Sequence, residues 1–144
     1  MSVTLADIIA RMPMFNFEQL TGRMIDPNGY VIGIGYSGAA LGKNNPQMQD
    51  VRDVGPIPVG DYTMGTPFDS PDHGPFCIPL IPDPGTQLYG RDAFLIHGDS
   101  VHKPGTASRG CIIMSRDVRN TMWQSGDHRL RVTSGSQIQQ EIIT

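Results

Sequence analysis

The chain has 144 residues and a formal net charge of −3, and this length predicts a single domain. Its 17 glycines and 12 prolines are too many turn formers for a helical bundle and are typical of short strands joined by loops. The acidic balance argues against nucleic acids and anionic membranes as partners, and two cysteines are too few for a disulfide-rich scaffold. We therefore expect one domain over residues 1–144, mainly β within the α+β class.

The N-terminal segment predicts a short amphipathic helix. Apolar residues recur at helical spacing between Thr4, which can cap the helix, and Pro13, which can stop it. We expect this extension, residues 1–14, to dock on the core. It lacks the basic region and the long apolar run of a secretory signal, so we expect no Sec signal, and no apolar run in the chain is long enough to predict a transmembrane helix.

From Phe15 onward the pattern changes to short strands and turns. We expect a hairpin or meander from residues 23–25 and 30–35, and then a long loop over residues 37–58. Three further strands are expected at residues 61–64, 76–81 and 93–96. The prolines between positions 67 and 84 should divide this middle region into loops and edge strands, because proline cannot donate to a sheet ladder.

The last third of the chain predicts a strand, a helix and a second strand. In order these are a strand at 111–114, a helix at 116–124, a closing strand at 128–133 and a polar tail at 134–144. Ser115 is a suitable N-cap for the helix, and Gly126 is a suitable terminator. Val118, Met122 and Trp123 should face the core.

A glycine pattern suggests a nucleotide site that the neighbouring sequence does not support. The run from Gly33 to Gly38 matches G-x-G-x-x-G, but a dinucleotide site needs this turn to open a helix. Residues 39–46 leave no room for one. Gly42 and Lys43 also lack the following Ser or Thr of a phosphate-binding loop.

The histidines and cysteines do not have the spacing of a metal site. Neither His73 with Cys77 nor His97 with His102 matches a strong zinc pattern, and we expect no metal and no other cofactor. Cys77 lies in an apolar run and should be a small core residue. His73 should be a loop histidine, and His128 a surface residue near the start of a strand.

One histidine and one cysteine form a candidate catalytic pair. His97 ends the apolar strand that begins at Phe94, and Cys111 enters the next apolar strand. A thiol with a pKa of about 8.5 is mostly protonated at neutral pH, and a neighbouring imidazole makes it nucleophilic by taking its proton. The alternative is a buried structural histidine beside an inert core cysteine. The residue types and their spacing alone leave both readings open.

The residues before Cys111 add chemistry to this pair. Gly110 leaves the backbone open to a substrate, and the amides of Gly110 and Cys111 can donate to an oxyanion. Arg109 adds a positive charge, which favours a thiolate and attracts a substrate carboxylate. These features favour the catalytic reading, in which Cys111 should react quickly with thiol probes below pH 8.

These motifs resemble the signature of the L,D-transpeptidase catalytic domain, in which a histidine precedes a Ser/Thr-x-Gly-Cys block by about fourteen residues. The wider chain, from Phe15 to Thr133, is similar to the type VI secretion L,D-transpeptidase effectors. The matching features are Gly35-Tyr36-Ser37-Gly38, Asn44-Asn45-Pro46, Gly55-Pro56-Ile57-Pro58-x-Gly60-x-Tyr62, Gly90-Arg91, Phe94-x-Ile96-His97-Gly98-Asp99 and Ser108-x-Gly110-Cys111-Ile112-Ile113.

The resemblance implies a β-rich L,D-transpeptidase-like fold with one short helix after the cysteine strand. It implies a cysteine acyl-enzyme that acts on the tetrapeptide stems of peptidoglycan, as an L,D-carboxypeptidase or by D-amino acid exchange. Cys111 would be the nucleophile and His97 its general base, while Gly98, Ser108 and Gly110 would shape the pocket and the oxyanion site.

Two positions depart from the wider family. Most L,D-transpeptidases carry a second histidine just before Gly-Cys, where this chain has Arg109. Many have arginine two positions after the cysteine, where this chain has Ile113. Both departures suit the effector branch.

Four further residues are candidates for binding substrate. Asp99 can orient His97, grip a substrate amine or cap a turn, and His102 is either an exposed loop residue or a substrate contact. Arg91 can hold a loop carboxylate or bind substrate. Arg109 belongs to a basic final third, since residues 101–144 hold six basic and three acidic side chains, which fits a substrate that ends in carboxylates.

The resemblance also implies a biological role. It predicts an antibacterial toxin made in the cytoplasm and delivered into the periplasm of a neighbouring cell, with the secretion machinery and an immunity protein as partners. One alternative is a module that binds the cell wall without catalysis. Another is a phage or housekeeping cell-wall enzyme with the same chemistry.

Overall fold

The computed structural model describes residues 2–135, and over this range the fold is mainly β, with ten strands and two α-helices. The strands are β1 (Phe15–Glu18), β2 (Arg23–Ile25), β3 (Val31–Ile34), β4 (Tyr36–Ser37), β5 (Gly60–Met64), β6 (Phe68–Ser70), β7 (Gly74–Pro82), β8 (Leu95–His97), β9 (Ile112–Ile113) and β10 (Arg129–Thr133). The helices are α1 (Leu5–Ala10) and α2 (Arg116–Gln124), and two short 3₁₀ turns are η1 (Ala40–Gly42) and η2 (Pro46–Met48). The α+β class is confirmed. Most of the predicted polar tail lies outside the described residues.

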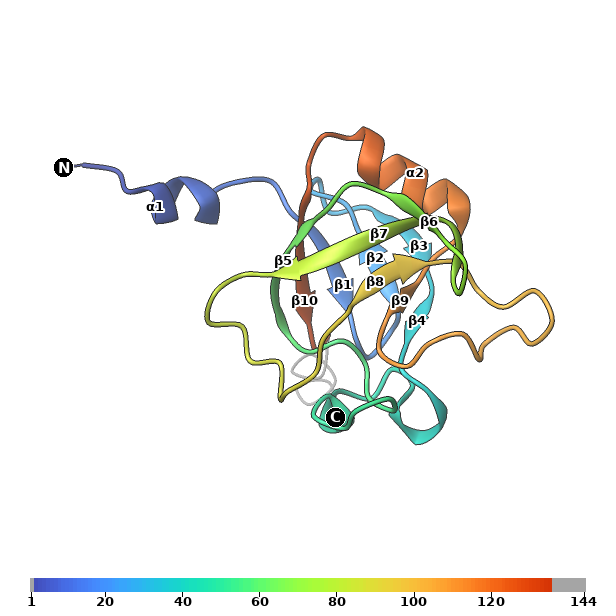
Figure 1. Ribbon diagram of the computed structural model, residues 1–144. Coiled ribbons are helices and arrows are strands. Elements are labelled where there is room, and N and C mark those ends of the chain that lie inside the picture. The colour runs from blue at the N-terminus through green and yellow to red at the C-terminus, as the bar shows by residue number, and fades with distance from the viewer. Residues whose placement is uncertain (1, 136–144) are drawn as a thin grey trace.

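The strands form one strongly curved sheet (Figure 1). Their order is β3-β2-β1-β10-β5-β7-β8-β9-β4, and β6 pairs with β7 beside this path. The pairs β1–β10 and β8–β9 are parallel, and the others are antiparallel. The two ends of the path are consecutive in the chain, because only Gly35 separates β3 from β4. A Cβ on Gly35 would lie 1.7 Å from the carbonyl oxygen of Ile113, so the chain crosses β9 too closely for any side chain here.

The core lies inside the curve of this sheet. Its buried members are Phe15, Phe17, Met24, Ile57, Tyr62, Met64, Ile78, Leu80, Phe94, Ile96, Ile112, Met114, Met122, Leu130 and Val132. Burial of each large apolar side chain stabilises the fold by about 1.5–3 kcal/mol. The core thus includes one residue from each of β8 and β9, which fixes the two strands next to the candidate pair.

Helix α2 begins and ends as predicted. The hydroxyl of Ser115 accepts from the amide of Val118 at 3.3 Å, and Gly126 has a φ of +80°, the left-handed conformation that favours glycine after a helix. Met122 is fully buried, and Val118 and Trp123 pack against the core while partly exposed.

The prediction that the N-terminal extension docks on the core is wrong. Helix α1 forms with Thr4 as its cap, in a capping box with Asp7, but none of its residues is buried. Leu5 is 73% exposed, and the helix projects away from the sheet (Figure 1). The curved sheet and α2 already cover the core, so α1 has no open apolar face against which to pack.

The expected proline break in the middle of the chain is also wrong in part. Strand β7 is nine residues long and runs through Pro75 and Pro79. The carbonyl oxygen of Pro79 accepts from the amide of Gly65 at 2.8 Å, where the chain passes from β5 to β6. Strands β5 and β6 pair with this edge of β7 on either side of Pro79. Because Pro79 lies between the two ladders, the amide hydrogen that it lacks is not needed there.

Two other local expectations have different outcomes. Cys77 is fully buried, as predicted. His128 is half-buried rather than a surface residue, because its ring stacks on Trp123 with centroids 3.8 Å apart. Among residues 2–135, no helix is long and apolar enough to cross a membrane.

Candidate active site

His97 and Cys111 project from the same face of two neighbouring strands. His97 ends β8 and Cys111 directly precedes β9, and the strands pair in parallel with Ile96 opposite Ile112. Side chains alternate between the faces of a strand, and both isoleucines are buried in the core. His97 and Cys111 therefore lie on the opposite face of this strand pair, in diagonal positions on adjacent strands.

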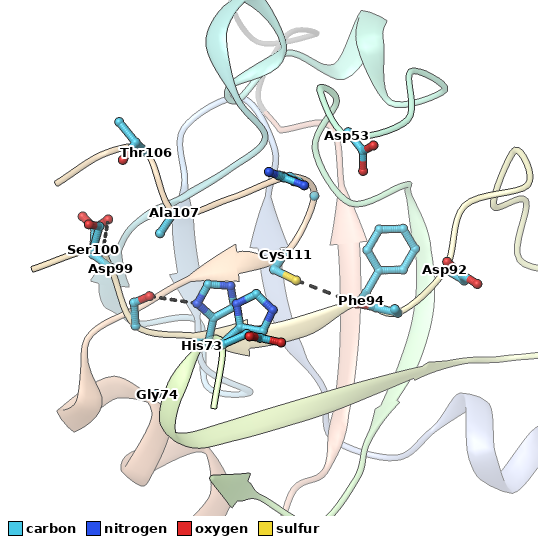
Figure 2. Close-up of a pocket in the computed structure, with 16 residues that line it drawn as sticks. Asp53, His73, Gly74, Asp92, Phe94, Asp99, Ser100, Thr106, Ala107 and Cys111 are labelled. Atoms are coloured by element: carbon cyan, nitrogen blue, oxygen red, sulfur yellow. Dashed lines mark hydrogen bonds between the residues drawn. The ribbon is translucent and has the colours of Figure 1, made fainter. Parts of the chain in front are cut away.

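The shortness of these strands brings the pair together. In a long parallel pair, the end of one strand and the start of the next lie at opposite edges of the sheet. Here the ladder has two residue pairs, so the end of β8 and the start of β9 open into one cavity of about 930 Å³. Figure 2 shows the sulfur of Cys111 in this cavity.

The backbone fixes the tautomer of His97. Its Nδ1 lies 2.8 Å from the carbonyl oxygen of Gly98. A carbonyl oxygen only accepts, so Nδ1 carries the hydrogen and Nε2 carries the lone pair. His97 is only 2% exposed, and its Nε2 is buried without a hydrogen-bond partner. The ring therefore presents a free proton acceptor.

Burial lowers the pKa of His97 below its usual value of about 6.5. The positive charge of Arg119 and the proximity of His73 act in the same direction, while the bond to Gly98 and the charge of Asp99 oppose it. The imidazole is therefore neutral at neutral pH, which is the state that a general base needs.

The thiol of Cys111 is neutral and points away from His97 in the resting structure. Its Sγ lies 3.9 Å from the carbonyl oxygen of Ala93. Desolvation raises the pKa of the thiol to about 11. Arg109 is exposed and is not among the groups that shift this pKa, which burial of the sulfur dominates; its expected effect on the thiolate stays a prediction. The resting pair is a thiol and a neutral imidazole.

The hydroxyl of Ser108 holds the backbone around the cysteine. It donates to the carbonyl oxygen of Cys111 at 2.6 Å and accepts from the amides of Gly38 at 2.8 Å and Gly110 at 3.1 Å. Ser108 is 1% exposed. This buried hydroxyl therefore shapes the site from behind the cavity wall.

Gly110 needs to be glycine. Its φ is +133°, and a Cβ would lie 2.5 Å from the guanidinium of Arg91. The expectation that its amide donates to an oxyanion needs correction, because that amide is already bonded to Ser108. Of the two amides expected at this position, only that of Cys111 is left for the role.

Arg91 lies behind the wall of the cavity, where the resemblance left open a contact with substrate. It is 4% exposed, and its guanidinium donates to the carbonyl oxygens of Gln49, Gly55 and Pro56 at 2.5–2.8 Å and of Arg109 at 3.4 Å. These four bonds use its side chain inside the protein. Its position supports the loop before Cys111 rather than a substrate.

Asp99 organises the loop that follows His97. Its carboxylate accepts from the amides of Ser100 at 2.8 Å and Gly105 at 3.1 Å, and from the hydroxyl of Tyr36 at 2.6 Å. It therefore caps the turn, one of the three expected roles, and the carbonyl of Gly98 orients the ring of His97 instead. His102, on the same loop, is exposed and does not line the cavity.

The cavity is more acidic than the basic final third of the chain predicts. Its charged lining consists of Asp53, Asp72, Asp92, Asp99 and Arg109, beside the two histidines. The other arginines of the final third pair elsewhere: Arg129 binds Asp83, Arg131 binds Asp61, Arg119 binds backbone carbonyls and Arg116 lies over the ring of Phe76. Arg109 is thus the cation that this part of the chain contributes to the cavity.

Sequence reasoning missed the position of His73. Its ring stacks on His97 with centroids 4.4 Å apart and an interplanar angle of 27°. It comes from the turn between β6 and β7 and lines the same cavity (Figure 2). No local signal announces this contact, because it joins a turn to a strand that follows later in the chain.

The two cysteines are free and cannot pair without movement of the backbone. Cys77 on β7 and Cys111 before β9 flank β8 on opposite sides. Two strand spacings separate them by about 10 Å, beyond the Cα separation of about 7 Å that a disulfide allows. Within residues 2–135, no group of three or more His, Cys, Asp or Glu side chains could hold a metal ion.

The structure thus places a cysteine and a histidine in one cavity of a β-rich fold. A family model described as the Tlde1 domain matches residues 33–139, and the chain belongs to this family, the type VI secretion L,D-transpeptidase effectors. The match starts later than the resemblance from Phe15, but it covers every candidate site residue. No curated protein and no solved structure matches the chain.

Membership carries a general biological context. Effectors of this family are delivered into target cells by type VI secretion, and their activity relates to the cell wall. Secretion machinery and an immunity partner are associated with the family in general.

Proposed function

We propose that this protein is a cysteine L,D-carboxypeptidase and L,D-transpeptidase that acts on tetrapeptide stems of peptidoglycan in the periplasm of the target cell. Cys111 is the nucleophile and His97 the general base, within one catalytic domain. The observation that carries the proposal is the free Nε2 of His97, buried in the cavity that also holds the thiol of Cys111.

The first half of the reaction forms an acyl-enzyme. Cys111 rotates its side chain from Ala93 toward His97, and Nε2 takes the thiol proton as Sγ attacks the carbonyl carbon between the third residue and the terminal D-alanine. The amide of Cys111 donates to the oxyanion. His97 then gives the proton to the leaving amine, the carbon–nitrogen bond breaks, and D-alanine departs.

The second half releases the acyl group. A water molecule, or the amine of a D-amino acid or of another stem, gives a proton to Nε2 and attacks the thioester. The carbon–sulfur bond breaks and the thiolate recovers the proton. Water yields a tripeptide, and an amine yields an exchanged or cross-linked stem.

The contacts of five surrounding residues support their roles. Gly98 holds the tautomer of His97, and Ser108 holds the backbone of Cys111. Arg109 is the cation on the rim of the cavity, where it can meet the terminal carboxylate of the stem. Asp99 fixes the loop over the cavity, and Arg91 supports the loop before the cysteine.

The test is mass spectrometry of a purified disaccharide tetrapeptide incubated with the protein, with and without D-methionine. The proposal predicts loss of D-alanine, or its replacement by D-methionine, and no reaction with Cys111→Ala. An unchanged tetrapeptide with folded, reduced wild-type protein would contradict the proposal and favour a module that binds the cell wall.

A further inference from the structure

The stack of His73 on His97 has a consequence beyond the cysteine–histidine pair. His73 is exposed, whereas His97 is 2% exposed. The ring of His73 therefore forms the solvent side of the pocket in which His97 lies. Stacked aromatic pairs are favourable beyond the area that they bury, so this contact restrains the plane of the imidazole that carries the free Nε2.

The turn that carries His73 is held in place by several bonds. The hydroxyl of Ser70 accepts from the amides of Asp72 at 3.2 Å and of His73 at 3.1 Å. Gly74, with a φ of +85°, ends the turn. The imidazole is thus presented by a built turn and not by a loose loop.

A buried arginine ties this turn to the strand of His97. Arg119 of α2 donates to the carbonyl oxygens of Pro75 at 2.9 Å and Phe76 at 2.7 Å, just after the turn. The same guanidinium passes behind Gly98, where a Cβ would lie 2.9 Å from it. One side chain therefore sets the position of both histidines.

We infer that His73 is a positioning residue for the catalytic base: its stacked ring holds Nε2 of His97 in the cavity. The inference rests on the proposed role of His97. His73 does not touch the thiol in this role, and it transfers no proton.

The pH dependence has a defined sign. Charged or titratable groups approach His97 from every side: His73 and Asp72 from the turn, Cys77 from β7, Cys111 from β9, Asp99 from the following loop and Arg119 from α2. Among these, His73 and Arg119 both lower the pKa of His97. Replacing the imidazole of His73 with an uncharged ring should therefore let His97 bind a proton at higher pH.

Two substitutions separate the stacked ring from the imidazole group. His73→Phe keeps a stacked ring but removes the ring nitrogens, and His73→Ala removes both. Tyr30→Ala, an exposed aromatic on the β2–β3 turn, is the matched control. We expect His73→Phe to retain kcat within about twofold at pH 8, and His73→Ala to lose roughly tenfold in kcat with little change in KM. The acid limb of kcat/KM should move to higher pH in His73→Phe.

Histidine NMR makes the result independent of turnover. In protein with labelled histidine, His97 should remain in the Nδ1–H tautomer in the wild type and in His73→Phe, and should mix tautomers in His73→Ala. The inference would be overturned if His73→Phe and His73→Ala had the same kcat and the same His97 tautomers. It would also be overturned if neither the acid limb of kcat/KM nor the titration of His97 moved in His73→Phe. If the variants show these NMR changes but the wild-type protein does not cleave the stem, the proposed function is contradicted and the inference about His73 is not.

Discussion

The hydroxyl of Ser108 donates to the carbonyl oxygen of Cys111 across 2.6 Å, and the hydroxyl oxygen of Ser108 accepts from the backbone amides of Gly38 and Gly110. One buried atom thereby ties the candidate nucleophile to Gly38, which lies 70 residues before Ser108 in the chain. The position of the thiol depends on this hydroxyl as much as on the strand that follows it.

Ser108→Ala should therefore weaken both stability and activity. It leaves two buried amides and one carbonyl without partners, which costs about 1–3 kcal/mol for each group that water cannot reach. We expect a lower midpoint in urea unfolding and a loss of roughly tenfold or more in kcat. Ser108→Thr keeps the hydroxyl and should retain more of both. If the alanine and threonine variants behaved alike, the hydroxyl would not hold the site.

The thiol of Cys111 should alkylate slowly at neutral pH. Desolvation raises its pKa to about 11, and only the thiolate reacts with iodoacetamide. The labelling rate should keep rising from pH 7 to beyond pH 10, which replaces the sequence-based expectation of fast labelling below pH 8. Cys77 is buried and should stay unlabelled, and Cys111→Ala gives the background. An inflection below pH 8 would mean a preformed thiolate.

Arg91 and Arg109 should affect different kinetic constants. Arg91→Lys loses bonds to the carbonyl oxygens of Gly55, Pro56 and Arg109 and should lower kcat with KM nearly unchanged. Arg109→Ala removes the exposed cation at the cavity and should raise KM about fivefold, which corresponds to roughly 1 kcal/mol for an exposed ion pair. Steady-state kinetics on the tetrapeptide separates the two. A raised KM in Arg91→Lys would return Arg91 to a role in substrate binding.

The pair of Arg129 and Asp83 should stabilise the fold in a pH-dependent way. Arg129 is buried, and its guanidinium binds both oxygens of the carboxylate at 2.5–2.7 Å. These bonds lower the pKa of Asp83. The stabilisation is therefore complete above the usual carboxyl pKa of about 3.9 and is lost as pH falls through the lower value in the folded state.

Asp83→Asn should lower the free energy of unfolding at pH 7 by about 1–3 kcal/mol, and the difference should shrink in acid. Asp61→Asn breaks the more exposed pair with Arg131 and should cost less than about 1 kcal/mol. Equal losses from the two substitutions in urea unfolding would show that burial of Arg129 adds nothing.

Local signals explain what the sequence predicts well. The cap at Ser115, the stop at Gly126 and the apolar spacing between them define α2 without reference to the rest of the chain. The pairing of His97 with Cys111 was also foreseeable, because each residue sits at an end of a short apolar strand. The cysteine and the histidine of the site are therefore predicted by two segments that are close together in the sequence.

Contacts between distant segments explain what could not be foreseen. Nothing near His73 marks it as the neighbour of His97, since the turn and the strand meet only when β7 pairs with β8. The sequence leaves Arg91 open between a loop contact and a substrate contact, because nothing near it in the chain predicts that the carbonyl oxygens of Gln49 and Gly55 bind its guanidinium. The apolar spacing of α1 likewise predicts a buried face, but none of its residues is buried against the sheet.

The most direct measurement is intact-protein mass spectrometry after brief mixing with the disaccharide tetrapeptide and acid quenching. We predict an adduct with the mass of the stem minus D-alanine, which peptide mapping assigns to Cys111 and which Cys111→Ala does not form. An adduct on another residue, or stem cleavage by Cys111→Ala, would contradict the assignment of the nucleophile.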